Sequence, residues 1–129
     1  MYKIPAGEYY LGDPCYVVRD GEWGQLLNMT DCFDNPEGFL SDGTRVVAFG
    51  TYYGDGEYYD QFGRDYGVDA GLIGLVPWND AFVGEGGHKV VFTKDVFADE
   101  DDGVLTFGDI VIDTKGSYED DEQEEDPIW

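Results

Sequence analysis

The sequence predicts a mainly β protein: a small antiparallel barrel or curled sheet of about eight short strands with one short helix. Three observations lead to this prediction. Short runs of β-branched and aromatic residues recur along the chain, and clusters of Gly, Asp and Pro separate them. Only one segment has helical periodicity. The predicted strands follow one another at a spacing of roughly 8–12 residues, which is typical of a small barrel or curled sheet.

The first third of the chain combines short strands with the helix. Residues 7–11 and residues 15–18 are predicted strands, separated by a Gly-Asp-Pro turn at 12–14. Asp20 can cap a helix, because its side chain can accept a hydrogen bond from an early helical N–H. One face of the following segment has the helical spacing i, i+3, i+4 and i+7, and it consists of Trp23, Leu26, Leu27 and Thr30.

The middle of the chain predicts a meander of antiparallel strands. Two turn clusters, at 35–38 and 41–43, precede it. Short glycine turns then separate runs of β-branched and aromatic residues, and consecutive runs of this kind pair as hairpins. The predicted strands are 45–53, 57–60 and 64–69, with turns at 54–56 and 61–63.

An apolar run at residues 70–76 predicts a fully buried strand that ends at Pro77. Gly71 and Gly74 interrupt this run, and a glycine inside a strand indicates a bulge or a close approach to the backbone. The remaining predicted elements are a glycine loop at 84–87, a strand at 88–93, and a hairpin of 104–107 and 110–114 around 108–109.

The chain is expected to form one globular domain over residues 1–116, followed by an acidic tail at 117–129. Its charge is the exceptional feature, because 29 acidic residues face 7 basic ones and give a formal net charge of −22. Most carboxylates therefore lack a basic partner and repel one another in water. This charge excludes direct binding to DNA, RNA or an anionic membrane, all of which need positive contact surfaces.

The cysteine pattern and the N-terminus predict a cytoplasmic protein. Cys15 and Cys32 form neither a CxxC unit nor a disulfide framework, although their spacing still allows one disulfide between them. Residues 1–8 have no apolar core of a signal peptide, and no run approaches the roughly 20 apolar residues of a membrane span.

No motif predicts catalysis, a metal site or a cofactor. His88 is the single histidine and has an ordinary setting before a strand, and two Cys with one His make no standard zinc set. Residues 99–103 resemble the start of an EF-hand loop, but the sixth and twelfth positions fall on Val104 and Ile110, where Gly and Glu are needed. Weak divalent binding by this cluster or by the tail stays open. The sequence predicts a binding protein rather than an enzyme.

An aromatic segment at residues 52–74 offers a second candidate site. Rings among glycines make good recognition surfaces, because they supply contact area at low entropic cost. Cross-strand aromatic packing explains the same pattern. Arg64 can pair with Asp60, Asp65 or Asp69, or can bind an anionic ligand. The candidate ligand-binding residues are Tyr52, Tyr53, Tyr58, Tyr59, Arg64, Tyr66 and Trp78.

Two stretches carry a resemblance to a known group. These are the run Leu-Gly-Asp-Pro-Cys-Tyr-Val at 11–17, followed by Trp23, Leu26 and Leu27, and the stretch 55–77 with its Val-Asp-Ala-Gly-Leu-Ile-Gly sequence. They resemble small acidic proteins of bacteriophages and some bacteria, which have no established activity. The resemblance covers about the first 80 residues. It implies a protein that acts in the cytoplasm of a bacterial host cell, where phage proteins block host systems.

The C-terminal segment is similar to the acidic tips of single-stranded-DNA-binding proteins. Those tips dock in basic, apolar pockets of repair and replication proteins, although here proline and isoleucine stand in the other order and the last residue is Trp. Carboxylates can steer such a tail while the terminal ring anchors it. The tail residues concerned are Asp120, Asp121, Glu122, Glu124, Glu125, Asp126 and Trp129.

The first functional hypothesis is an acidic binding protein that occupies a basic groove of a nucleic-acid-handling partner, as a DNA mimic or phage-type inhibitor. Unpaired carboxylates approximate the field of duplex DNA, which carries about one negative charge per 1.7 Å. The alternatives are a protein that sequesters a nucleotide-like ligand in the aromatic segment, and an accessory or structural phage protein. The residues expected to bind the partner are the tail residues named above together with Asp99, Glu100, Asp101 and Asp102.

Overall fold

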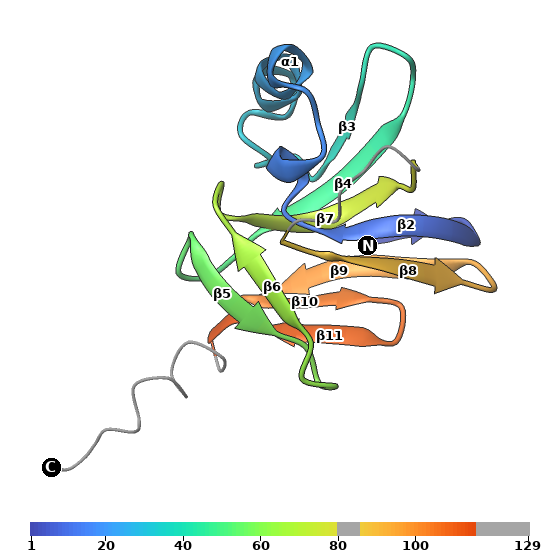
Figure 1. The fold of residues 1–129 in the computed structure, drawn as a ribbon, viewed down its shortest axis with the longest axis vertical. Coiled ribbons are helices and arrows are strands. Elements are labelled where there is room, and N and C mark those ends of the chain that lie inside the picture. The colour runs from blue at the N-terminus through green and yellow to red at the C-terminus, as the bar shows by residue number, and fades with distance from the viewer. Residues whose placement is uncertain (80–85, 116–129) are drawn as a thin grey trace, which may run out of the picture.

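The computed structural model describes residues 1–79 and 86–115, and these form three layers (Figure 1). Helix α1 (Asp20–Thr30) lies on one side, a five-stranded sheet lies in the middle, and a four-stranded sheet lies beyond it. All strand pairs are antiparallel. The prediction of a mainly β fold with one short helix is confirmed, whereas the strands form three sheets and no closed barrel is detected in the described residues.

The five-stranded sheet forms the centre of the molecule. Its strand order is β3 (Glu37–Phe39), β4 (Arg45–Gly50), β7 (Leu72–Pro77), β2 (Gly7–Gly12) and β8 (His88–Phe92). The apolar runs of β4 and β7 are buried on both faces, as expected for strands between two layers. Val47 and Phe49 face the four-stranded sheet, while Val46 and Ala48 face α1.

The four-stranded sheet packs its inner face against this central sheet. Its strand order is β1 (Tyr2–Ile4), β9 (Val96–Asp101), β10 (Val104–Phe107) and β11 (Ile110–Asp113). Buried and less buried residues alternate along these strands, so that Ala98, Leu105, Phe107 and Ile112 enter the main core. The other face of this sheet is turned to solvent.

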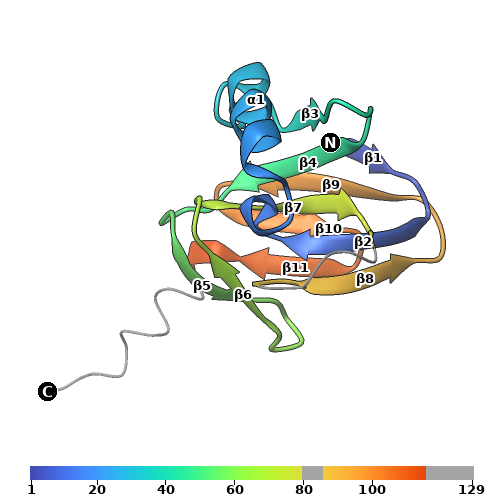
Figure 2. The same cartoon turned by 45° about the horizontal axis from the view of Figure 1, so that its top comes forward.

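A separate hairpin of β5 (Gly56–Tyr59) and β6 (Asp65–Val68) crosses one end of both sheets (Figure 2). Tyr58 and Tyr66 stand opposite each other in its register and enter the core. The turn of the hairpin also covers the edge of β11. The Val111 N–H donates to Gln61 Oε1 at 2.8 Å, and the Gln61 N–H donates to the Val111 carbonyl at 3.2 Å. A covered edge cannot pair with a strand of another chain.

The predicted helix is confirmed, and its apolar face is the predicted one. Leu26 and Thr30 are fully buried, and Trp23 and Leu27 pack against the same cluster. Arg19 occupies the N-cap position and Asp20 is the first helical residue, so the helix begins one residue earlier than a cap at Asp20 would place it.

The helix ends in an unusual turn. Asp31, Cys32 and Phe33 all have positive φ angles, of 55°, 56° and 63°. Such angles cost energy in residues other than glycine. Phe33 offsets the cost, because its ring is buried and stacks on Trp23 with ring centroids 6.0 Å apart.

Several local predictions differ from the structure. Residues 15–18 are not a strand, because the Cys15 N–H donates to Asp13 Oδ1 at 3.0 Å and starts a 3₁₀ turn over Pro14–Tyr16. The strand predicted at 45–53 ends at Gly50, and β5 pairs with β6 rather than with β4. Strands β1, β3 and β9 were not predicted. Among the described residues, no helix is long and apolar enough to cross a membrane.

Candidate interaction face

The solvent-facing side of the four-stranded sheet carries two of the acidic residues predicted to bind a partner, Asp99 and Asp101. Strand β9 alternates, so Ala98 points into the core while Phe97, Asp99 and Asp101 point outward. We call this side the outer face. Its residues are Lys3, Phe97, Asp99, Asp101, Val104, Thr106, Val111 and Asp113.

The register places carboxylates around an apolar centre. Val104 lies between Asp101 on β9 and Asp113 on β11, and Thr106 lies between Asp99 and Val111. Asp99 and Asp101 are two residues apart on one strand, a separation of about 7 Å. The α-amino group of Met1 lies 3.8 Å from Asp99 Oδ1. The outer face is therefore acidic at its margin and apolar between the carboxylates.

The turn from β9 to β10 consists of Asp102 and Gly103, whose φ angles are 51° and 86°. Positive φ at both central residues is typical of a two-residue hairpin turn. Glu100 accepts a hydrogen bond from the Gly103 N–H at 3.0 Å, and Asp102 forms an ion pair with Lys115 at 2.8 Å. The hydrogen bond to Asp102 raises the pKa of Lys115 above its usual value. Two of the four predicted carboxylates therefore stabilise the turn.

Glu100 points away from the outer face. Together with Asp31, Asp34 and Phe49 it lines an open groove of about 490 Å³ beside the strained turn that follows α1. The predicted group at 99–102 thus splits, with Asp99 and Asp101 on the outer face, Glu100 in this groove and Asp102 at the turn. The tail residues predicted to bind a partner lie outside the described residues.

Most described carboxylates have no cation close to them. Five of the seven Lys and Arg side chains each form one ion pair, as Arg45 with Glu37 at 2.6 Å and Lys89 with Glu8 at 3.4 Å. Within residues 1–79 and 86–115, no Lys or Arg pairs with the carboxylates of Asp31, Asp34, Asp55, Asp101 and Asp109. The excess negative charge of the sequence is therefore also present on the folded surface.

Phe97 belongs to the outer face and was missed by sequence reasoning. Its side chain is 51% exposed, and it lines a shallow groove of about 380 Å³ with Met1, Asp99, Thr106 and Asp109. One signal could have found it, because Asp102-Gly103 is a strong hairpin signal that predicts a strand on each side.

The aromatic residues predicted to bind a ligand are not gathered at one site. Tyr58 and Tyr66 are fully buried, and the Tyr58 hydroxyl donates to the Gly54 carbonyl at 2.9 Å. Tyr52 and Tyr53 contact each other at the start of β7, whereas Trp78 follows the end of β7, about 20 Å away. Tyr59 is 38% exposed and donates to Glu57. Tyr58 and Tyr66 are thus core residues with no ring face open to a ligand.

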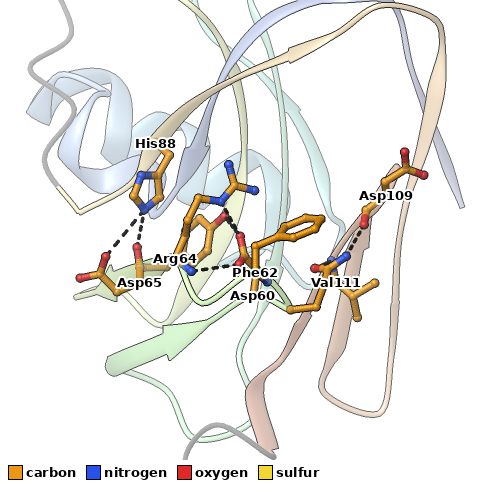
Figure 3. Close-up of polar contacts among 9 residues, drawn as sticks. Asp60, Phe62, Arg64, Asp65, His88, Asp109 and Val111 are labelled. Carbon is orange, nitrogen blue, oxygen red and sulfur yellow. Dashed lines mark hydrogen bonds and ion pairs between the residues drawn. The ribbon is translucent and has the colours of Figure 1, made fainter.

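Arg64 pairs with Asp60, one of the three predicted partners, at 2.8 Å (Figure 3). Asp60 also accepts hydrogen bonds from the Tyr66 hydroxyl at 2.7 Å and from the N–H groups of Phe62 and Arg64. Burial alone would raise the pKa of Asp60, but these hydrogen bonds outweigh burial and lower it. Burial and the same contact raise the pKa of Tyr66. This cluster fixes the turn of the β5–β6 hairpin.

Three further side chains, Asp13, Cys15 and His88, are also held by contacts within the fold. Asp13 is fully buried and accepts hydrogen bonds from the N–H groups of Asp69 and Ala70 at 2.9 and 2.7 Å. Burial and a hydrogen bond to Asp13 raise the pKa of Cys15 to about 12, so its thiol is protonated at neutral pH. The His88 ring Nε2 lies 2.6 Å from the Asp65 carbonyl oxygen. In the part of the chain that the structure describes, no three His, Cys, Asp or Glu side chains form a metal-binding group.

No family model matches the chain, and the searches of curated proteins and of solved structures gave no match either. The resemblances to small phage proteins and to acidic C-terminal tips therefore stay expectations. A functional proposal therefore rests on the geometry and charge of the described residues.

Proposed function

We propose that this chain is a non-enzymatic acidic binding protein, an inhibitor of phage type or a DNA mimic, that engages the basic surface of a nucleic-acid-handling protein. The observation that carries the proposal is the set of exposed carboxylates without a cation, of which Asp101 lies on the outer face and Asp109 lies at the turn beside it. Such charges attract a basic partner, increase its association rate and exclude acidic competitors.

A binding role fits the described groups better than catalysis. A catalytic acid or base needs a shifted pKa together with access to a substrate. Asp60 and Tyr66 bond each other in the core, and the Cys15 thiol is held protonated beside Asp13. These shifted groups therefore have structural explanations that require no substrate.

The charge density indicates what kind of mimicry the outer face can achieve. A duplex of about 20 Å, the length of β9, carries roughly 12 negative charges. The outer face and its two turns present only Asp99, Asp101, Asp102, Asp109 and Asp113. The described surface thus shares the sign of the DNA field but not its density, and the seven acidic residues of segment 117–129 add to the charge.

A binding panel tests the proposal. Purified nucleases, helicases and polymerases with basic DNA-binding grooves would be titrated with the full chain at low salt, with and without duplex DNA. We expect at least one complex that weakens steeply as salt rises and that DNA displaces. No binding across the panel at low salt, or complexes that DNA leaves intact, would contradict the proposal.

A further inference from the structure

In the described residues, no further sheet or helix covers the outer face. Helix α1 packs on one side of the central sheet, and the main core fills the space between the two sheets (Figure 1). On the far side of the four-stranded sheet, Phe97 and Asp101 are exposed, and the Lys3 side chain is 64% exposed. The fold therefore presents an open sheet face opposite its own helix.

The open face combines apolar and acidic side chains in a defined pattern. Phe97, Val104 and Val111 provide apolar surface, and Thr106 adds a methyl group between them. Asp101 and Asp113 lie at one end of this surface, Asp109 lies at the turn at the other end, and Asp99 lies on β9 between them. A large exposed apolar side chain inside a polar margin is typical of an interaction site.

The size of the face limits the occupant to one structural element. Six residues of β9 span about 20 Å, and four strands span about 14 Å. A standard protein interface buries about 800 Å² on each partner, which is more than this face offers. A helix with its side chains is about 10–12 Å wide, so one helix fits across the face.

The backbone chemistry favours a helix over a strand. On a sheet face all N–H and C=O groups lie in the plane and pair with neighbouring strands, so an added strand would find no partners there. A helix satisfies its own backbone and contributes only side chains. A second copy of this chain would bring a further charge of −22, and an anionic membrane would repel the carboxylates.

We infer that the outer face is the docking site for one basic amphipathic helix of a partner protein. The helix places its apolar stripe on Phe97 and Val111, and its Lys or Arg side chains reach Asp99, Asp101 and Asp109. This inference rests on the proposed function and adds the element of the partner that is recognised. The carboxylates select the charge of the partner, and Phe97 selects an apolar stripe.

The test uses a defined probe, an 18-residue peptide of Leu, Lys and Ala whose Leu residues form one helical stripe. A peptide of the same composition in scrambled order, which has no stripe, is the matched ligand control. In an NMR titration of the full chain, we expect the stripe peptide to shift amide signals of β9, β10 and β11. The stripe peptide should bind at least ten times more tightly than the scrambled one.

Two protein variants separate the apolar contribution from the charge contribution. Phe97→Thr keeps a strand-forming residue at a half-exposed position and should abolish the preference for the stripe peptide. Phe39→Thr, at a 46% exposed phenylalanine on β3, should leave the preference unchanged. The double variant Asp99→Asn, Asp101→Asn should weaken the binding of both peptides by similar factors.

The outcomes distinguish this inference from the proposed function. Equal binding of the two peptides, shifts confined to another surface, or an unchanged preference in Phe97→Thr would overturn the helix site. A partner from the DNA-handling panel whose affinity survives Phe97→Thr would also overturn it and leave the proposed function intact. Specific peptide binding combined with a negative panel would support the site and contradict the nucleic-acid-handling partner.

Discussion

Asp60 shows how a protein with so many carboxylates places one of them inside its fold. Its side chain is shielded from solvent and is surrounded by the Arg64 guanidinium, the Tyr66 hydroxyl and two backbone N–H groups. Charge-assisted hydrogen bonds of this kind are the stronger ones in proteins, and a buried charge without them is costly. Asp60 is therefore expected to stabilise the hairpin rather than to act on a ligand.

Replacing Asp60 by Asn should lower the free energy of unfolding by about 3 kcal/mol. The amide leaves Arg64 without its ion pair and offers one acceptor oxygen where the carboxylate has two. Urea denaturation at neutral pH measures the change. Asp55→Asn, at an exposed residue, is the control and should lie within about 0.5 kcal/mol of the wild type. A similar small change in Asp60→Asn would contradict the structural role of Asp60.

The same residue predicts a pH dependence. The pKa of Asp60 is lower in the folded state, so its stabilisation is present above the ordinary carboxyl pKa of about 3.9 and is lost as pH falls through the folded value. The difference in stability between wild type and Asp60→Asn should therefore shrink below about pH 4. Denaturation curves over pH 2–7 measure it, and a difference that stays constant would exclude the pKa effect.

At the scale of the element, the contact between β4 and β7 has the least tolerance for added volume. A Cβ atom at Gly74 would lie 2.5 Å from Ala48 Cβ and against the Val47 carbonyl. The two strands are central and buried on both faces, so neither can move without disturbing a packed layer. The absence of a side chain at Gly74 lets the strands come together.

Gly74→Ala should destabilise the protein by about 3 kcal/mol, the upper end of overpacking costs in a core. Gly24→Ala is the matched control, because this glycine lies in α1 with no neighbouring atom within 4 Å of an added Cβ. In a helix this change should stabilise by about 0.8–1 kcal/mol. Chemical denaturation measures the change in the free energy of unfolding for both variants. Equal changes would contradict the close approach of β4 and β7 at Gly74.

An element could be predicted from the sequence where the spacing of its apolar residues agrees with their burial in the fold. The buried strand at 70–76 and the helical face of Trp23 and Leu26 were predicted, because apolar spacing and burial agree. Strand β9 was not predicted, because Asp and Glu are depleted in strands and here lie on the solvent side of a sheet. Its pairing with β1, about 95 residues away in sequence, leaves no local signal.

The candidate site was predictable only in part for the same reason. Asp99 and Asp101 were predicted to bind a partner as members of a charged run, and the structure shows that they share an outward side. Their split from Glu100, and the presence of Phe97 beside them, follow from the alternation of a strand that was not predicted. The burial of Tyr58 and Tyr66 could not be predicted, because their packing depends on contacts across sheets.

At the scale of the molecule, the net charge of −22 acts against the compact state. The range of this repulsion depends on salt, with a screening length of about 30 Å at 0.01 M and about 3 Å at 1 M. The melting temperature should therefore rise as NaCl is added, because the folded state concentrates the carboxylates. Calorimetry over this range measures the rise, and a constant or falling melting temperature would show that the charges are balanced on the surface.

The central claim is that carboxylates at the outer face, rather than net charge alone, select a basic partner. Two triple variants change the charge equally: Asn at Asp99, Asp101 and Asp109, and Asn at Asp31, Asp34 and Asp55, which lie in turns outside the four-stranded sheet. The decisive measurement is the affinity of each variant for a partner identified in the binding panel. We predict that the first variant binds at least ten times more weakly than the second. Equal affinities of the two variants would contradict the claim.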